Sequence, residues 1–399
     1  MNGRPLIAPL NQRLEAEQLI RISVAAVLGT LALFNFWFGQ QGAQLYDFGS
    51  FWASGKAALE GVNPYALYPE TFRLPGSNTY HPNLNPPASL LLFAPLAWLD
   101  PFATIKVQWW LGLAAYAGFV GFTLYRNPRP DAMLVGAWAL ALPAFWDGIR
   151  MGQVYLPIMI AAAAAWHLME RDRLLAAAIV IGCLAALKPN LLVWPALLFL
   201  AGHRRMGVTA GLAFAGASLL PLLFFGAGVY AQWFEMLTGD LGGRSGYFAN
   251  ATVMAIGVRA GSHILGIALA LMVLAWAVRL VWGARLSMTE ISAIAIGVAI
   301  LASPVAWMHY LLLLLPALLR MRWNRGVVIA AAVMAVPMPA LFWIFKILPL
   351  HYPALAEVIR ATIGSAYSWA ALLLVISIAR LCLAAAHDRG STPLTGHQS

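Results

Sequence analysis

Charged side chains are scarce in this sequence, and their scarcity excludes a water-soluble globular protein. Asp, Glu, Lys and Arg make up 10% of the 399 residues, whereas hydrophobic residues make up 61%. A soluble fold of this length needs more polar surface than these residues supply. We therefore predict an integral membrane protein. The formal net charge of +10 is then a guide to membrane topology, and no nucleic-acid partner is expected.

Cysteine is almost absent, which excludes a disulfide framework. Cys183 and Cys382 both lie inside apolar runs and are expected to pack as small hydrophobic residues. Closely spaced carboxylates are also rare. There is no DxD element, and Glu170 with Asp172 alternates with arginines as in a solvated turn. The sequence therefore predicts no metal site and no cofactor.

Long apolar runs recur from Ile22 to Ala386, and about 20 apolar residues in a helix span the hydrocarbon core of a bilayer. The predicted fold class is therefore all-α and polytopic, with about twelve transmembrane helices. These lie near 22–38, 103–125, 132–147, 153–169, 174–187, 189–201, 207–230, 261–283, 288–303, 305–319, 327–348 and 361–385. The run 86–99 is only about fourteen residues long, which is typical of a re-entrant or interfacial element.

Arginine clusters determine the predicted sidedness. If 86–99 does not cross, the basic connections at 126–129, 171–173, 204–205, 285 and 320–325 all lie on the side of the N-terminus. Basic residues concentrate on the cytoplasmic side, so both termini are predicted to be cytoplasmic in an inner (plasma) membrane. The first apolar run is then an uncleaved anchor. We predict one transmembrane domain at 1–386, extracytoplasmic loops at 39–102 and 231–260, and a disordered cytoplasmic tail at 387–399.

Polar residues from distant loops gather on the predicted outer face. They are Asp47, Lys56, Asp147, Arg150, Lys188, Arg244, Arg259, His309 and His351. Several lie beside Pro or Gly in DGIRMGQ (147–153), LKPN (187–190) and SPVAWMHY (303–310), where broken helices can line a cavity. Ordinary loop charges that meet water or lipid headgroups are the alternative explanation.

Asp47 opens the segment YDFGSFWASGKAALEGVNPY (46–65), which allows two interpretations. In the first, the segment is an interfacial helix capped by Asp47, with a Lys56–Glu60 pair and an end at Gly61. Its apolar face would contain Phe48, Phe51, Trp52, Gly55 and Leu59. In the second, the Asp47 carboxylate stands at the mouth of a cavity and removes a proton from an incoming hydroxyl.

Five elements follow one another along the chain: Asp47 with FWASGKAALEGVNPY, NPPASLLLFAPLAWL (85–99), GQ (152–153), LKPN and SPVAWMHY. In this order they resemble glycosyltransferase family 87. The resemblance implies the multi-spanning GT-C architecture and transfer of mannose or a related sugar from a polyprenyl-phosphate donor to a glycolipid or glycan on the extracytoplasmic face. It also implies that Asp47 is the catalytic base and that His309 contacts phosphate or acceptor. Further substrate contacts are expected from Trp52, Asp147, Gln153, Asn190 and Tyr310.

The chemistry of such a transfer agrees with this inventory. A lipid-phosphate donor brings its own leaving group, so the protein must neutralise a phosphate, deprotonate a hydroxyl and align both reactants. The candidate phosphate contacts are Lys188, Arg150, Arg259, Arg244 and His309. Metal-independent transfer with inversion at the anomeric carbon is expected. A lipid-linked glycan flippase or secondary transporter is the alternative, and an internal repeat between the two halves would favour it.

Overall fold

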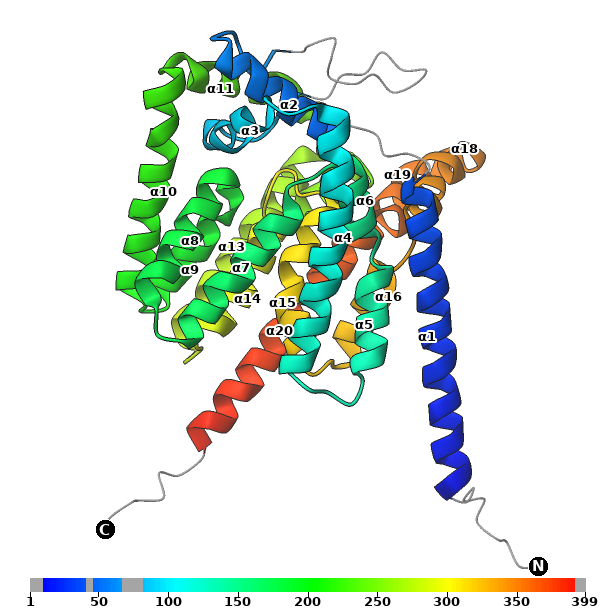
Figure 1. Ribbon diagram of the computed structural model, residues 1–399. Coiled ribbons are helices and arrows are strands. Elements are labelled where there is room, and N and C mark those ends of the chain that lie inside the picture. Colours follow the sequence, from blue (N-terminus) through cyan, green and yellow to red (C-terminus); the bar gives the residue numbers. More distant parts are fainter. Residues whose placement is uncertain (1–9, 41–45, 67–81, 392–399) are drawn as a thin grey trace, which may run out of the picture.

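The computed structural model describes residues 10–40, 46–66 and 82–391, and every regular element in these ranges is helical (Figure 1). The α-helices are α1 (Leu10–Gln40), α2 (Tyr46–Leu59), α3 (Leu90–Leu96), α4 (Pro101–Arg126), α5 (Ala132–Ala141), α6 (Pro143–Met151), α7 (Tyr155–Glu170), α8 (Leu174–Leu187), α9 (Val193–Leu200), α10 (Arg204–Phe225), α11 (Gly228–Arg244), α12 (Val253–Arg259), α13 (His263–Gly283), α14 (Met288–Leu301), α15 (Leu315–Arg320), α16 (Arg325–Met334), α17 (Met338–Phe342), α18 (Leu348–His351), α19 (Ala356–Ala361) and α20 (Ala366–Ser391). The 3₁₀ helices are η1 (Pro87–Ser89), η2 (Pro189–Leu192), η3 (Met308–Leu314), η5 (Pro353–Leu355) and η6 (Ile363–Ser365), and η4 (Trp343–Ile347) is a short π-helix.

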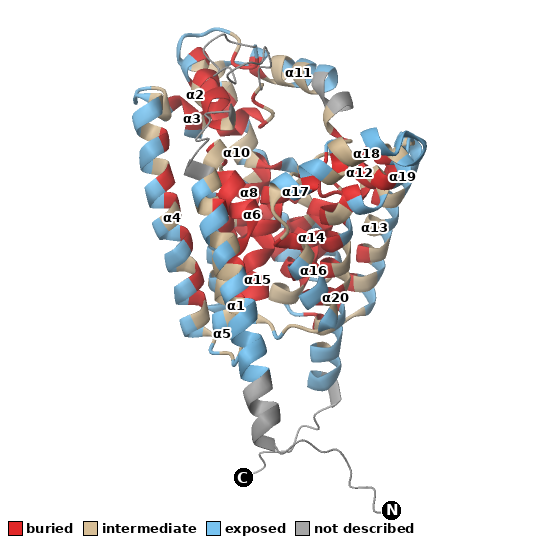
Figure 2. Cartoon of the chain, turned by 90° about the vertical axis from the view of Figure 1, so that its right-hand side faces the viewer, coloured by how far each residue is buried: buried red, intermediate tan, exposed pale blue. Residues whose placement is uncertain are grey.

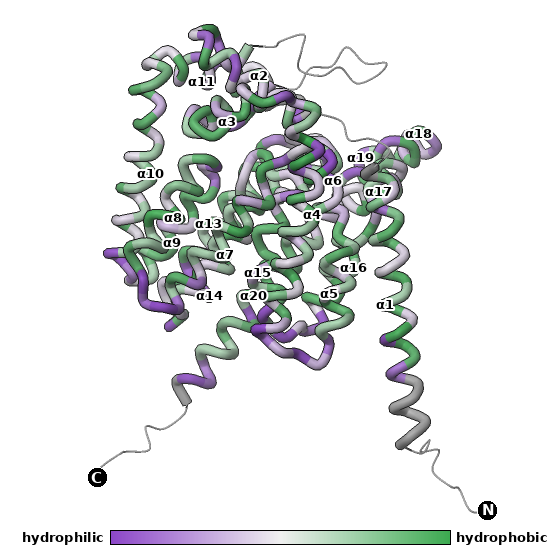
Figure 3. Tube along the Cα trace, viewed as in Figure 1, coloured by the Kyte–Doolittle hydropathy of each residue, from purple (hydrophilic) through white to green (hydrophobic). Residues whose placement is uncertain are grey.

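Six helical segments of the described chain are long and apolar enough to cross a membrane. They are Glu17–Phe38, Pro101–Arg126, Ala132–Met151, Arg204–Phe225, His263–Gly283 and Pro353–Arg389. A seventh would be Arg325–Met334 with Met338–His351, although these two helices meet at 83°. Green hydrophobic segments fill the middle of the molecule in Figure 3, and purple segments lie at its two ends. The predicted all-helical membrane protein is confirmed, whereas the count of about twelve spans stays a prediction.

Helix α14 forms the centre of the core. All of its residues from Ile291 to Leu301 are buried, and they belong to the red interior of Figure 2. Its start is fixed by a capping box, in which Ser287 and Glu290 satisfy each other's backbone N–H groups. Helices α1 and α10 lie at the periphery (Figure 1) and are largely exposed, as expected for helices that face lipid.

Helices α2 and α3 pack on each other above the core. The rings of Phe51 and Phe93 stack with centroids 4.5 Å apart. A Cβ atom at Gly55 would lie 2.3 Å from the Phe93 carbonyl oxygen, so only glycine allows this approach. The apolar face of α2 that was predicted to lie on the bilayer is therefore buried mainly against α3, although Leu59 is exposed. The predicted Lys56–Glu60 pair is present at 4.0 Å, and the helix ends before Gly61, whose φ is +71°.

The arginine-rich connections share one end of the molecule, as the topology prediction requires. Arg320 pairs with Glu170, and Arg129 Nη1 donates to the Leu318 carbonyl over 3.1 Å. The first turn of α1 and the last turn of α20 point to this end, whereas α2, α3 and α11 lie at the opposite end (Figure 1). Residues 387–391, predicted as disordered tail, belong to α20, and 392–399 lie outside the described residues.

Candidate active site

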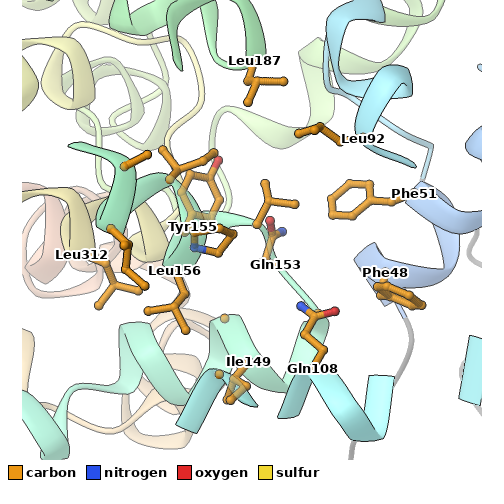
Figure 4. A pocket seen from close by; sticks show the side chains of 18 of the residues that line it. Phe48, Phe51, Leu92, Gln108, Ile149, Gln153, Tyr155, Leu156, Leu187 and Leu312 are labelled. Carbon is orange, nitrogen blue, oxygen red and sulfur yellow. The ribbon is translucent and has the colours of Figure 1, made fainter. Parts of the chain in front are cut away.

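A cavity of about 510 Å³ lies at the end of the molecule formed by α2 and α3. Its walls come from α2, α3, α4, α7 and the ends of α6 and α8, and most of them are apolar (Figure 4). Leu111 of α4 and Ile160 of α7 are 64% and 38% exposed, and both line the cavity. The cavity therefore reaches the apolar outer surface between α4 and α7.

Asp47 and Gln153 meet at this cavity although 106 positions separate them. The Gln153 Nε2 atom donates a hydrogen bond to Asp47 Oδ2. An ionised carboxylate can only accept, so the amide must turn its NH₂ group toward Asp47 and its carbonyl oxygen away. That oxygen, Oε1, is buried and has no hydrogen-bond partner within the described chain. Gln153 lies between Phe48 and Phe51 of α2 and Tyr155 of α7, so a bound hydroxyl could satisfy the oxygen (Figure 4).

Gly152 makes this meeting sterically feasible. It ends α6 with φ +69°, the left-handed region that favours glycine. A Cβ atom there would lie only 2.4 Å from Phe48 Cβ. The chain turn after α6 and the first turn of α2 are therefore in direct contact. Because α2 begins at Tyr46, Asp47 lies inside its first turn and not at the N-cap of the first interpretation.

Lys188 supplies the positive charge of the cavity. It follows α8 directly, lines the cavity and is buried, and its Nζ atom bonds Asn85 Oδ1 at 2.5 Å. The same atom lies 4.6 Å from the ring centroid of Tyr155 and 5.5 Å from that of Tyr310. Burial lowers the pKa of Lys188 to about 7, and the Asp47 carboxylate acts in the opposite direction. An incoming anion would hold this lysine in its charged form.

Asp147, Arg150 and His309 form a buried network behind the cavity wall. Asp147 accepts a hydrogen bond from Arg150 Nη2 and lies against His309 Nε2, each at 2.7 Å. The His309 ring packs against Tyr155 with centroids 5.9 Å apart. None of these three residues is part of the cavity lining, and His309 lies behind two residues that are, Tyr155 and Gly148. The Asp147 carboxylate is engaged by a cation and an imidazole. Asp47 does not line the cavity itself either, but it is hydrogen-bonded to Gln153, which does.

Tyr310 packs against Tyr155, with ring centroids 4.2 Å apart, and so supports the part of the cavity wall that Lys188 contacts. Trp52 and Asn190 are held elsewhere, since their side chains donate to the carbonyls of Leu99 at 3.1 Å and Ala299 at 3.4 Å. Neither lines the cavity. The substrate contacts predicted for Trp52, Asn190 and Tyr310 stay predictions.

The two arginines expected from the second outer loop do not line the cavity. The Arg259 guanidinium is buried and donates to the Asn250 carbonyl at 2.7 Å and to Ser365 Oγ at 2.9 Å. It thereby ties this loop to the segment before α20. Arg244 is half-buried at the end of α11. These hydrogen bonds indicate that Arg259 stabilises the fold. Phosphate contact by Arg244 or Arg259 stays a prediction, because neither residue lines the cavity.

Sequence reasoning missed Asn85 and Tyr155. Asn85 opens the element NPPASLLLFAPLAWL, which attracted attention as an apolar run and not for its first residue. Tyr155 follows the GQ pair by two positions and begins α7. A polar aromatic residue directly after a glycine-ended helix was the available signal. Among the described residues, no group of three or more His, Cys, Asp or Glu side chains is placed to hold a metal ion.

Comparison with known proteins adds one finding to this geometry. A family model described as Glycosyltransferase family 87 matches residues 83–304, which is more than half of the chain. The matched range includes Asn85, Gln153 and Lys188, begins after Asp47 and ends before His309. No curated protein matches the chain, and no solved structure does.

Proposed function

This chain belongs to glycosyltransferase family 87, and from that premise we propose which sugar transfer it performs. It moves a hexose, specifically mannose, from a polyprenyl-phosphate donor to a hydroxyl of a glycolipid or glycan. The reaction takes place on the extracytoplasmic side of the inner membrane, and both chain termini are cytoplasmic. Asp47 is the general base.

One observation carries the proposal: the Asp47 carboxylate accepts a hydrogen bond from Gln153, and Gln153 lines the same apolar cavity as the buried ammonium of Lys188. Sugar transfer from a lipid phosphate needs a base for the acceptor hydroxyl, a cation for the phosphate and an apolar space for the lipid chain. The phosphate is neutralised by Lys188, a point charge with donors free to reorient. The isoprenoid chain lies along apolar residues such as Leu92, Leu111 and Ile160, toward the membrane.

The proposed step is a direct displacement. The acceptor hydroxyl attacks the anomeric carbon, its proton passes to Asp47, and the bond between the anomeric carbon and the phosphate oxygen breaks. Polyprenyl phosphate leaves with the electron pair of that bond, and its charge is neutralised by Lys188. One displacement inverts the anomeric carbon. No metal is required in this scheme, so we expect EDTA to leave the rate unchanged.

Two further residues support the base and the donor site. Gln153 holds one oxygen of Asp47 and offers its own buried carbonyl oxygen to a sugar hydroxyl. His309, fixed by Asp147, acts as a positioning residue that packs on Tyr155, whose ring lies below Lys188. In this proposal His309 contributes from one layer behind the substrates, without touching them.

The decisive experiment is Asp47→Asn in the purified protein, assayed with a panel of radiolabelled polyprenyl-phosphate sugars. Asparagine keeps the shape and removes the base, so we expect donor binding without transfer. Unchanged transfer would eliminate Asp47 as the base. Failure of the wild-type protein to use any donor of the panel would refute the proposed donor class.

Sidedness has its own test in intact cells. In a Cys183→Ser background, a membrane-impermeant maleimide should modify Glu60→Cys, at the exposed end of α2, and should spare Arg322→Cys. Both positions are exposed, so accessibility to the reagent depends on the side of the membrane. The reverse labelling pattern would overturn the proposed topology.

A further inference from the structure

A second cavity, of about 810 Å³, lies at the end of the molecule opposite to Asp47. Its lining comes from the α9–α10 connection (199–204), the α13–α14 connection (281–287) and Arg389 near the end of α20. These connections are among the purple segments at the lower end of Figure 3. We propose that this basic cleft binds the phosphate group of an anionic membrane lipid.

Positive charge in the cleft exceeds negative charge. Arg204, Arg285 and Arg389 line it, and no acidic residue does. Arg389 is committed to Glu290, with N–O distances of 3.0 and 2.7 Å. Arg204 and Arg285 are exposed and form no ion pair or hydrogen bond through their side chains with any described residue. Two guanidinium groups are therefore available for one ligand, and guanidinium groups bind phosphate oxygens in a bidentate manner.

Backbone donors complement these cations. The 22-residue helix α10 begins at Arg204, and its N-cap residue His203 makes no side-chain capping bond. The N–H groups of its first turn lack intrahelical partners, and a phosphate oxygen accepts from such groups. Gly202 and His203 line the cleft together with Arg204. The cleft thus combines exposed side-chain donors with backbone donors at one place.

Apolar residues at the rim favour a phosphate that is carried by a lipid. Trp282 is 73% exposed and Phe199 is 43% exposed, and both belong to the cleft. They end the apolar helices α13 and α9, and exposed aromatic residues at helix ends are typical of the membrane–water interface. A headgroup in the cleft would let the acyl chains lie against these helices. Basic pockets between helices on the cytoplasmic side are known to hold anionic headgroups.

The test compares two double variants that lose the same charge. Arg204→Gln/Arg285→Gln empties the cleft of its unpaired cations. Arg171→Gln/Arg173→Gln removes two exposed arginines from the α7–α8 connection, which does not line the cleft. Each purified full-length protein is mixed with dioleoyl phosphatidylglycerol, dioleoyl phosphatidylcholine or inorganic phosphate. Lipid adducts are counted by native mass spectrometry, and Tm is measured with and without each probe.

We expect phosphatidylglycerol to form a one-to-one adduct and to raise Tm in the wild type and in the 171/173 variant. The variant with both Arg204 and Arg285 replaced should bind it roughly thirtyfold more weakly, because each basic residue near the surface contributes about 1 kcal/mol to anionic-lipid binding. If both double variants lose the same share of phosphatidylglycerol binding, general surface charge explains the effect and the proposal is overturned. Unchanged phosphatidylglycerol binding by the 204/285 variant, or equally strong binding of phosphatidylcholine, would also overturn it. A rise in Tm with inorganic phosphate as large as that with phosphatidylglycerol would overturn the lipid as the source and leave a soluble phosphate compound.

Discussion

Replacing Gly152 with alanine should separate Asp47 from Gln153 without removing any polar group from the site. Gly152 has φ +69°, and its Cα faces Phe48, the residue next to Asp47. The added methyl group would start 2.4 Å from Phe48 Cβ. Since carbon atoms pack at about 3.5–4.0 Å, the first turn of α2 must retreat by about 1 Å or more.

The substitution lowers the free energy of unfolding in two ways. An alanine in the left-handed region costs about 1–2 kcal/mol. Overpacking against Phe48 adds about 1–3 kcal/mol, unless α2 moves and relieves it. We expect α2 to move, because it packs chiefly on the small helix α3. A shift of about 1 Å in a catalytic group can lower the rate about 100-fold. Loss of turnover should therefore exceed what the loss of stability explains.

The assay is sugar transfer at saturating donor and acceptor, with the folded fraction measured by size-exclusion chromatography and Tm. Gly61→Ala is the matched control. Gly61 has φ +71°, and nothing lies within 4 Å of the position that its Cβ would occupy. It carries the same backbone strain without a clash. We expect its turnover to stay within about twofold of the wild type, while Gly152→Ala loses about 100-fold.

A folded Gly152→Ala protein with wild-type turnover would refute the reasoning, since Asp47 would then not depend on its contact with the 152–153 turn. Equal losses in both variants would also refute it, because strain alone would then account for the effect. A larger loss in Gly61→Ala would place the sensitive contact at the other end of α2.

Three further changes test other parts of the site. Gln153→Leu should lower kcat/KM by roughly tenfold to a hundredfold and move the acid limb of its pH profile to higher pH, because a hydrogen bond to a charged group contributes about 1.5–3 kcal/mol. Gln108→Leu, at another amide of the cavity wall, should leave that limb in place. Because burial lowers the pKa of Lys188 to about 7, the donor KM should rise as pH increases from about 6 to 8, and Lys188→Arg should flatten this rise, since arginine stays charged. Arg259→Lys should lower Tm with little change in kcat of the folded protein, since only the forked guanidinium reaches its several acceptors, and a large loss of kcat at unchanged Tm would contradict this structural role.

The sequence predicted the class of fold because apolar run length depends on local composition alone. Where two short helices share one apolar run, composition cannot show it. Residues 327–348 were predicted as one span, yet the helices Arg325–Met334 and Met338–His351 meet there at 83° around Pro337. Proline lacks a backbone donor and restricts the residue before it, so a break there is physically sensible. The sequence alone does not give its angle.

The residues of the candidate site at broken helices could be predicted better than the arginines in the loops. Gln153 and Lys188 stand beside Gly or Pro, where the backbone must leave the helix and side chains can enter a cavity. Asp47 lies inside the first turn of α2, and the sequence left its role open between a helix cap and a base. Arg259 stands at the end of a short helix, and its partners are carbonyls and hydroxyls more than 100 positions away as well as nearby ones. Charge alone could not distinguish a phosphate contact from this internal tie. Asn85 was overlooked because the partner that brings it into the site, Lys188, lies 103 positions further on.

With the proposed polyprenyl-phosphate donor, the exposure of cavity residues on α4 and α7 changes which concentration matters to the enzyme. A lipid-linked substrate that slides in through Leu111 and Ile160 never has to leave the bilayer. Its supply is then a number of molecules per unit area of membrane, and collisions occur in two dimensions. Diluting vesicles in buffer should leave this encounter rate untouched, whereas blending the membrane with inert phospholipid should slow it in proportion to the mole fraction that remains.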